Sequence, residues 1–189
     1  GQTYSPGGTF NINPVATASS GLAVSYAVGP NTVCTLGSGT TVNIVGAGTC
    51  TITASQAGDG NYNAATPVPQ NVTINKANQT ITFNAQPGQT YSPGGTFNIN
   101  PVATASSGLA VSYAVGPNTV CTLGSGTTVN IVGAGTCTIT ASQAGNANYN
   151  AATPVAQNVT IAKANQTITF GAQSGQTYSP GGTFNINPV

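Results

Sequence analysis

Very few side chains in this sequence could take part in chemistry. The chain has 189 residues, its only charged side chains are Asp59, Lys76 and Lys163, and it contains no His, Glu or Arg. General acid–base catalysis draws mainly on His, Glu, Asp and Lys, and a Ser-His-Asp or Cys-His arrangement needs a histidine. A single Asp also supplies too few oxygen ligands for calcium. The composition therefore predicts no enzymatic activity, no bound metal ion and no other cofactor.

The four cysteines, which are the other reactive side chains, follow an internal repeat. A stretch of 15 residues that begins at Gly1 occurs again at Gly88 and Gly175, so the repeat length is 87 residues. The first two periods differ only at the pairs Asp59/Asn146, Gly60/Ala147, Pro69/Ala156, Asn75/Ala162, Asn84/Gly171 and Pro87/Ser174. A site built for chemistry is usually present once. Near-identical copies instead favour units that each do the same mechanical or adhesive job.

Each period has two cysteines 16 residues apart, Cys34 with Cys50 and Cys121 with Cys137. Two cysteines without histidine or carboxylate fall short of the four ligands of a structural zinc site, and no Cys-x-x-Cys redox motif is present. Two buried free thiols are the alternative to a disulfide. We predict one disulfide in each period, because closing a loop of this length stabilises a small domain by about 3 kcal/mol. Since disulfides persist in oxidising compartments, we expect the protein outside the cell or in the periplasm.

Short strands separated by Gly, Pro and Asn must position these cysteines. Alternating apolar and polar residues predict strands at 22–28, 33–36, 41–45, 49–55 and 68–74, with shorter pieces near Phe10 and Ile81. The strand 49–55 places Cys50 and Ile52 on one face, and no stretch has the 3.6-residue period of a helix. The expected fold class is all-β, with about seven strands per period and the size of an immunoglobulin-type sandwich.

The charge and hydropathy patterns also restrict the classes of partner that the chain can bind. The formal net charge is +1, so the chain lacks the basic surface that binds nucleic acid or an anionic membrane. No apolar run approaches the roughly 20 residues of a membrane-spanning helix. The hydrophobic residues make up 39% of the chain and lie in alternating runs, which favours folded β-structure over disorder.

Several motifs of the period occur in a recognisable order. They are Val33-Cys34-Thr35, the run Gly46-Ala47-Gly48-Thr49-Cys50-Thr51-Ile52-Thr53-Ala54, the loop Asn61-Tyr62-Asn63-Ala64-Ala65 and the junction Lys76-Ala77-Asn78-Gln79-Thr80-Ile81. Together they resemble the tandem bacterial immunoglobulin-like repeats of large secreted and cell-surface proteins. The resemblance covers the whole period. It implies a β-sandwich that serves as a stalk, spacer or fibre element, and it identifies no ligand.

The junction motif sets the frame of the domains. One complete sandwich is expected over residues 76–162, with 79–83 as its first strand. Residues 1–75 then form a repeat that lacks this strand, and residues 163–189 hold the first strands of a third repeat. Ile81 and Phe83, with their copies Ile168 and Phe170, are therefore candidate assembly residues. We favour a segment of a continuous array over strand donation between chains, because residues 175–189 duplicate residues 1–15.

Two further pairs of residues could have a specific role. Tyr62 and Tyr149, in an Asn-rich loop, could form a sugar-binding platform, although such a Tyr more often packs over the end of a sandwich. Lys76 and Lys163 could enter isopeptide cross-links, but that chemistry needs a nearby buried acid, so we expect exposed junction lysines.

We expect a non-enzymatic extracellular structural protein that self-associates along a fibre. Because the surface has almost no charge, like-charge repulsion does not oppose lateral bundling. The alternative is an adhesin segment that binds a glycan or a host or cell-surface protein.

Overall fold

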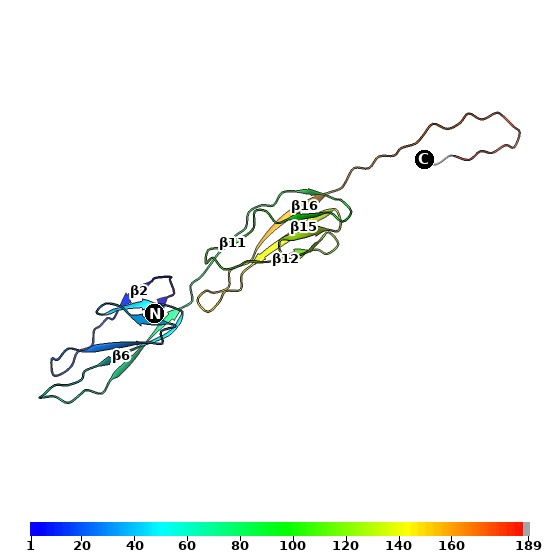
Figure 1. The fold of residues 1–189 in the computed structure, drawn as a ribbon. Coiled ribbons are helices and arrows are strands. Elements are labelled where there is room, and N and C mark those ends of the chain that lie inside the picture. Colours follow the sequence, from blue (N-terminus) through cyan, green and yellow to red (C-terminus); the bar gives the residue numbers. More distant parts are fainter. Residues whose placement is uncertain (187–189) are drawn as a thin grey trace.

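The computed structural model describes residues 1–186, and this part of the chain contains strands and no helix. Two units follow one another along a common axis, and the remaining residues extend away from the second (Figure 1). We call residues 1–75 the first unit, 76–162 the second unit and 163–186 the tail; residues 187–189, the end of the expected third repeat, lie outside the described residues. Residues whose numbers differ by 87 are called equivalent. The predicted all-β class is confirmed.

The first unit has two sheets. Its strands are β1 (Gln2–Thr3), β2 (Thr9–Asn11), β3 (Ser25–Gly29), β4 (Cys34–Leu36), β5 (Thr41–Ile44), β6 (Gly48–Ser55) and β7 (Val68–Asn75). One sheet has the order β1-β7-β6-β3, in which only the β1–β7 pair is parallel, and the other has the antiparallel order β2-β5-β4. The strands expected at 33–36 and 41–45, which flank Gly37-Ser38-Gly39, form the antiparallel β4–β5 hairpin.

The second unit repeats both sheets and adds a third pairing. Its strands are β8 (Ile81–Thr82), β9 (Gln89–Thr90), β10 (Thr96–Asn98), β11 (Thr104–Ala105), β12 (Ser112–Gly116), β13 (Cys121–Leu123), β14 (Thr128–Ile131), β15 (Gly135–Ser142) and β16 (Val155–Ala162). The sheets β9-β16-β15-β12 and β10-β14-β13 match those of the first unit. In addition, β8 pairs antiparallel with β11, and neither strand has a counterpart in the first unit.

In each unit the two sheets face one another across a single core. In the first unit, Val42 and Ile44 of one sheet cluster with Ile52 and Ile74 of the other. The side chains alternate along each strand as the period-2 pattern requires, so β5 buries Val42 and Ile44 and leaves Asn43 half-buried on its other face. This coarse arrangement is that of a β-sandwich.

The structure corrects three details of the sequence interpretation. The strand expected at 22–28 begins only at Ser25, because its partner β6 ends at Ser55, which pairs with Ser25 and leaves the preceding residues without a ladder. The first strand expected at 79–83 is reduced to Ile81–Thr82, since its only partner, β11, is also two residues long. Leu36, which alternation in the strand expected at 33–36 places on the same face as the buried Cys34, is 38% exposed as the last residue of β4 before the turn.

Candidate functional site

Both predicted disulfides are present. Cys34 is bonded to Cys50 and Cys121 to Cys137, with Cα atoms 5.8 and 5.7 Å apart, and all four cysteines are fully buried. Each bond joins the two facing sheets, from β4 to β6 in the first unit and from β13 to β15 in the second. Their burial makes these cysteines structural links between sheets rather than reactive sites.

In the second unit, residues 76–87 lie along the edge of the sandwich. We call them the covering segment. Ile81 and Phe83 belong to the buried core cluster and are 9% and 5% exposed. The Phe83 ring lies 5.8 Å from the ring of Tyr113. On the backbone side, Ser106 N donates to the carbonyl oxygen of Thr80 at 2.9 Å, which extends the β8–β11 pairing. The segment therefore supplies core side chains and also pairs an otherwise open strand edge.

Two buried glutamines fix the ends of this segment. Gln79 donates from Nε2 to Gln143 Oε1 at 2.6 Å and to the carbonyl oxygen of Asn150 at 2.7 Å. Gln86 accepts from the backbone N of Asn100 at 2.8 Å and donates to the carbonyl oxygen of Pro101 at 2.9 Å. Burying a polar group without a hydrogen bond costs free energy. These contacts therefore hold the covering segment at one position along the edge of the sandwich.

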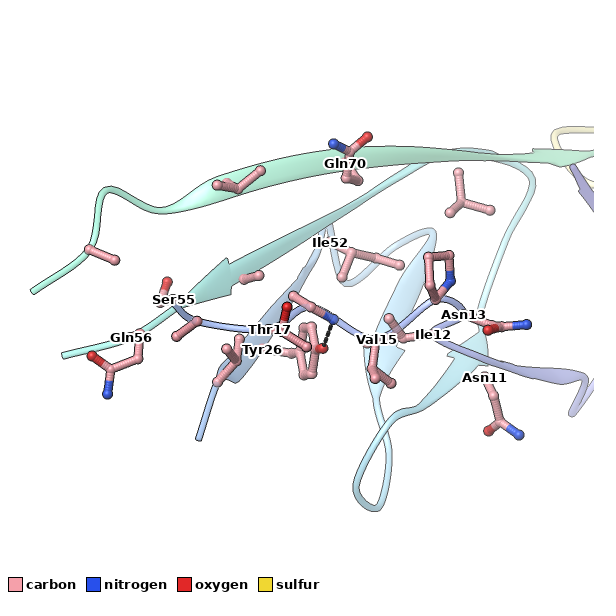
Figure 2. A pocket seen from close by; sticks show the side chains of 18 of the residues that line it. Asn11, Ile12, Asn13, Val15, Thr17, Tyr26, Ile52, Ser55, Gln56 and Gln70 are labelled. Carbon is pink, nitrogen blue, oxygen red and sulfur yellow. Dashed lines mark hydrogen bonds between the residues drawn. The ribbon is translucent and has the colours of Figure 1, made fainter. Parts of the chain in front are cut away.

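The first unit has a cavity where the second unit holds this segment. Its volume is about 800 Å³. Apolar residues of both sheets and of the loop after β2 line it, among them Phe10, Ile12, Val15, Tyr26 and Ile52. Figure 2 shows Ile52 pointing across this space toward Ile12 and Tyr26. We call this cavity the open groove.

Equivalent residues show that the open groove is an uncovered part of the core. Ile99, Ala103, Ala141, Ala152 and Val159 are buried in the second unit. Their equivalents in the first unit, Ile12, Ala16, Ala54, Ala65 and Val72, are half-buried or exposed. All five pairs are identical in sequence. The difference in exposure therefore comes from the absence of the covering segment over the first unit in the described structure, and not from a change of side chain.

The tail carries a second copy of the covering segment. Residues 163–173 repeat residues 76–86 except that Gly171 replaces Asn84. No strand forms in the described part of the tail, and Ile168 and Phe170, which repeat Ile81 and Phe83, are 94% and 66% exposed. Of the predicted assembly residues, the structure thus buries Ile81 and Phe83 and leaves Ile168 and Phe170 without a core.

A second candidate contact area lies where the two units meet. The Tyr149 ring meets the Tyr4 ring edge-on, with centroids 5.4 Å apart. Asn148 Oδ1 accepts a hydrogen bond of 2.9 Å from the backbone N of Ala47. Both contacts reach from the Asn-rich loop of the second unit to the end of the first. We call these four residues the junction contacts.

The two junction lysines have different surroundings. Lys76 is exposed and its Nζ donates to the carbonyl oxygen of Asn146 at 2.8 Å. The next residue, Ala77, exchanges backbone hydrogen bonds of 2.9 Å with Asn148 and Asn150, which attaches the connection to the same loop. Lys163, the equivalent of Lys76, is exposed. The acid that isopeptide formation needs is missing from this loop, because the position of Asp59 is occupied by Asn146 in the second unit, and Asn146 meets Lys76 through its backbone carbonyl.

The Asp59/Asn146 difference leaves the loop geometry unchanged. Asp59 Oδ1 accepts from the backbone N of Asn61 and Tyr62 at 2.7 and 2.9 Å. Asn146 Oδ1 accepts the equivalent pair of bonds at 2.8 and 2.9 Å. The only carboxylate of the chain is therefore a turn-forming residue that an amide replaces directly.

Tyr62 and Tyr149 occupy the same place in equivalent loops but have different neighbours. Tyr149 is half-buried against Tyr4, whereas Tyr62, at the outer end of the first unit, is 53% exposed. The expectation that this Tyr packs over the end of a sandwich describes Tyr149, although the sandwich in question is the neighbouring unit.

Sequence reasoning missed several residues of these two areas. Tyr4 and Ala47 were not singled out, because nothing in an isolated period shows which of its ends meets the next one. Gln79 and Gln86 were also missed, although a glutamine on the inward parity of an otherwise apolar strand, as at Gln79 two residues before Ile81, was an available signal.

Comparisons with known proteins add no identification: no family model matches the chain, and no curated protein matches it. Among residues 1–186, no three His, Cys, Asp or Glu side chains gather where they could hold a metal ion. The described residues include no helix long and apolar enough to cross a membrane.

Proposed function

We propose that this chain is part of a structural array of immunoglobulin-like β-sandwiches that acts outside the cell as a stalk, fibre or sheath element. The observation that carries the proposal is the junction between the units. The units are joined without a spacer, since β7 ends at Asn75 and Ala77 is already bonded to the loop of the second unit. Such a connection supports a stiff rod rather than two freely moving domains.

The junction contacts can be repeated along a longer array. Tyr91 and Ala134, at the far end of the second unit, are the equivalents of Tyr4 and Ala47, and the loop with Asn61 and Tyr62 at the outer end of the first unit is the equivalent of the loop with Asn148 and Tyr149. Each unit therefore carries both halves of the junction at opposite ends. This head-to-tail arrangement supports extension along one axis.

The disulfides and the surface support the proposed environment. Two buried disulfides favour an oxidising compartment. With one acidic and two basic side chains in the chain, neighbouring rods would meet little electrostatic repulsion. Lateral bundling is therefore part of the proposal.

The adhesin alternative has less support. Its best candidate was the loop tyrosine, yet the Tyr149 position is used for the contact with Tyr4. A role in joining units accounts for the Asn-Tyr-Asn loop without a glycan.

Small-angle X-ray scattering on matched variants tests the rod. Tyr149→Ala with Asn148→Ala removes both junction contacts, and we expect a shorter maximum dimension and a broader distance distribution as the units begin to bend. The control, Tyr62→Ala with Asn61→Ala, changes the same residue types in the equivalent loop at the outer end and should leave the scattering unchanged. Equal scattering from both variants and the unmodified chain would contradict a junction-stiffened rod.

A further inference from the structure

Gln79 is a buried polar residue that bonds the covering segment to two loops of the second unit. Within residues 1–186 the buried polar side chains are those of Gln79 and Gln86, which are 6% and 8% exposed, although glutamine is mostly an exposed residue. Two of the three hydrogen bonds of Gln79 go to the Asn-rich loop of the second unit, residues 143–152. This loop also carries Asn148 and Tyr149, which contact the first unit.

The three bonds fix the direction in which the Gln79 amide points. Ser107 Oγ donates to Gln79 Oε1, so the Nε2 atom faces the other way. From there it donates to Gln143 Oε1 at 2.6 Å and to the carbonyl oxygen of Asn150 at 2.7 Å. Both hydrogens of the Nε2 group are thus used. Because an unpaired buried amide is costly, the side chain favours the one loop position that provides both acceptors.

The two acceptors lie where they control the shape of the Asn-rich loop. Gln143 is at its base, and its Oε1 also accepts a hydrogen bond from the backbone N of Gly145. Asn150 directly follows Tyr149, whose ring meets the first unit. Gln79 therefore holds the loop at its base and also one residue away from the tip that reaches across the junction.

We propose that Gln79 positions the Asn-rich loop for its contacts with the first unit, so that the seating of the covering segment is coupled to the formation of the junction contacts. Gln79 touches neither Tyr4 nor Ala47 of the first unit, and it acts on them through Asn150 and the loop tip. A change inside the second unit is then transmitted to the end of the first. This inference rests on the proposed function, since it explains how the junction is kept stiff.

The covalent connection between the units runs through the same residues. β7 ends at Asn75, Ala77 exchanges backbone hydrogen bonds with the Asn-rich loop, and Gln79 follows two residues later. A pull on this connection acts on Ala77 and Gln79 before it reaches Ile81 and the core. Because these two residues also hold the loop, the junction contacts and the start of the covering segment should be released together.

Amide hydrogen exchange on the full chain tests the coupling. The reporter is the backbone N–H of Ala47, which donates to Asn148 Oδ1 across the junction. Gln79→Met keeps the length of the side chain and removes its hydrogen bonds, so exchange at Ala47 should become roughly tenfold faster. The amide of Gly37, which donates to the carbonyl oxygen of Thr41 within the first unit, should keep its exchange rate.

Gln86→Met is the matched control. Gln86 also holds the covering segment by hydrogen bonds, but its partners Asn100 and Pro101 are not part of the Asn-rich loop. This variant should lower the melting temperature of the second unit, as Gln79→Met does, and leave exchange at Ala47 unchanged. Equal acceleration at Ala47 by both variants would overturn the inference, because Gln79 would then act only through the stability of its own unit.

A combined variant tests the route of the coupling. Asn148→Ala removes the acceptor of the Ala47 bond and should itself accelerate exchange at Ala47. Adding Gln79→Met should then have no further effect, because the loop no longer offers the contact that Gln79 positions. Fully additive effects would overturn the proposed route.

A milder variant keeps the test valid if Gln79→Met prevents the second unit from folding. Ser107→Ala removes only the bond that orients the Gln79 amide, and it should accelerate exchange at Ala47 in the same direction but less. An unchanged rate at Ala47 in a folded Gln79→Met variant, or in Ser107→Ala if only that variant folds, would overturn the inference.

Failure of this inference can be distinguished from failure of the proposed function. If Tyr149→Ala with Asn148→Ala bends the rod in scattering while exchange at Ala47 does not respond to Gln79→Met, the rod stands and the coupling is wrong. If Ala47 responds to Gln79→Met while scattering from the junction variant is unchanged, the coupling stands and the junction-stiffened rod is wrong.

Discussion

The first and second units have almost the same sequence but differ in how completely their cores are covered. Ala103, Ala141 and Ala152 are buried in the second unit, while their identical equivalents in the first are half-buried or exposed. The two main sheets, their strand orders and the disulfides are the same, and only the second unit has the additional β8–β11 pair. The comparison shows that the two sheets alone give the fold, whereas full burial needs a segment that lies outside them.

We expect this difference in core coverage to appear mainly as a difference in stability between the two units. Burying side chains such as those of Ile81 and Phe83 contributes about 1.5–3 kcal/mol each, in domains whose total stability is commonly only about 5–15 kcal/mol. The first unit, when its groove is empty, should therefore unfold at a clearly lower temperature than the second. The following predictions use equivalent residues to test that difference.

The largest effect is expected from truncating a core side chain of the covering segment. Phe83→Ala should destabilise the second unit by about 3–5 kcal/mol, because it removes a buried aromatic side chain. This corresponds to a decrease in its melting temperature of roughly 10 °C or more. Phe170→Ala, the same substitution in the exposed tail, should leave the thermal unfolding of the second unit unchanged. Calorimetry on the two variants would contradict the comparison if both shifted the upper transition equally.

The disulfides should matter to different extents in the two units. Removing one should cost about 2–5 kcal/mol. We expect Cys34→Ala with Cys50→Ala to abolish the lower calorimetric transition, because the incompletely covered first unit has less stability to lose. Cys121→Ala with Cys137→Ala should only lower the upper transition.

Loss of the upper transition with retention of the lower one would reverse the proposed order of stabilities.

The smallest effect is expected at the only carboxylate. Asp59→Asn should change the stability of the first unit by less than about 0.5 kcal/mol, since Asn146 makes the same two backbone bonds at the equivalent turn. The lower calorimetric transition should keep its midpoint. A shift of several degrees would mean that the charge of Asp59 has a role that the shared turn geometry does not include.

Much of the sheet structure could be predicted from the sequence. The alternation around Cys50 and Ile52 led to β6, and the patterns at 33–36 and 41–45 led to β4 and β5, each within one or two residues. The prediction failed before Ser25, where the side-chain pattern continues but no partner strand does. Alternation reports which face of a segment is apolar, and it cannot report whether a neighbouring backbone is available for pairing.

The candidate sites were predicted less completely. Ile81 and Phe83 could be recognised as inward-facing residues of a strand that the first unit lacks, because that conclusion needs only the repeat frame and the period of 2. The contact of Tyr149 with Tyr4 could not be predicted, since the residues are 145 positions apart (149 minus 4), and their meeting depends on how one unit is oriented against the next.

The sequence by itself determined which catalytic and metal-binding side chains are missing, the 87-residue repeat, the all-β class and the cysteine pairs. These features depend on residue type, on the identity between the two periods and on the local period of apolar residues. Only the tertiary structure decided that the covering segment is held by Gln79 and Gln86, that equivalent residues differ in burial and that the Asn-rich loop joins the units. Nearly identical sequences can differ in this way because burial is a property of what lies over a residue. In the first unit, nothing in the described structure lies over Ile12 in the place that Phe83 and its neighbours occupy over Ile99.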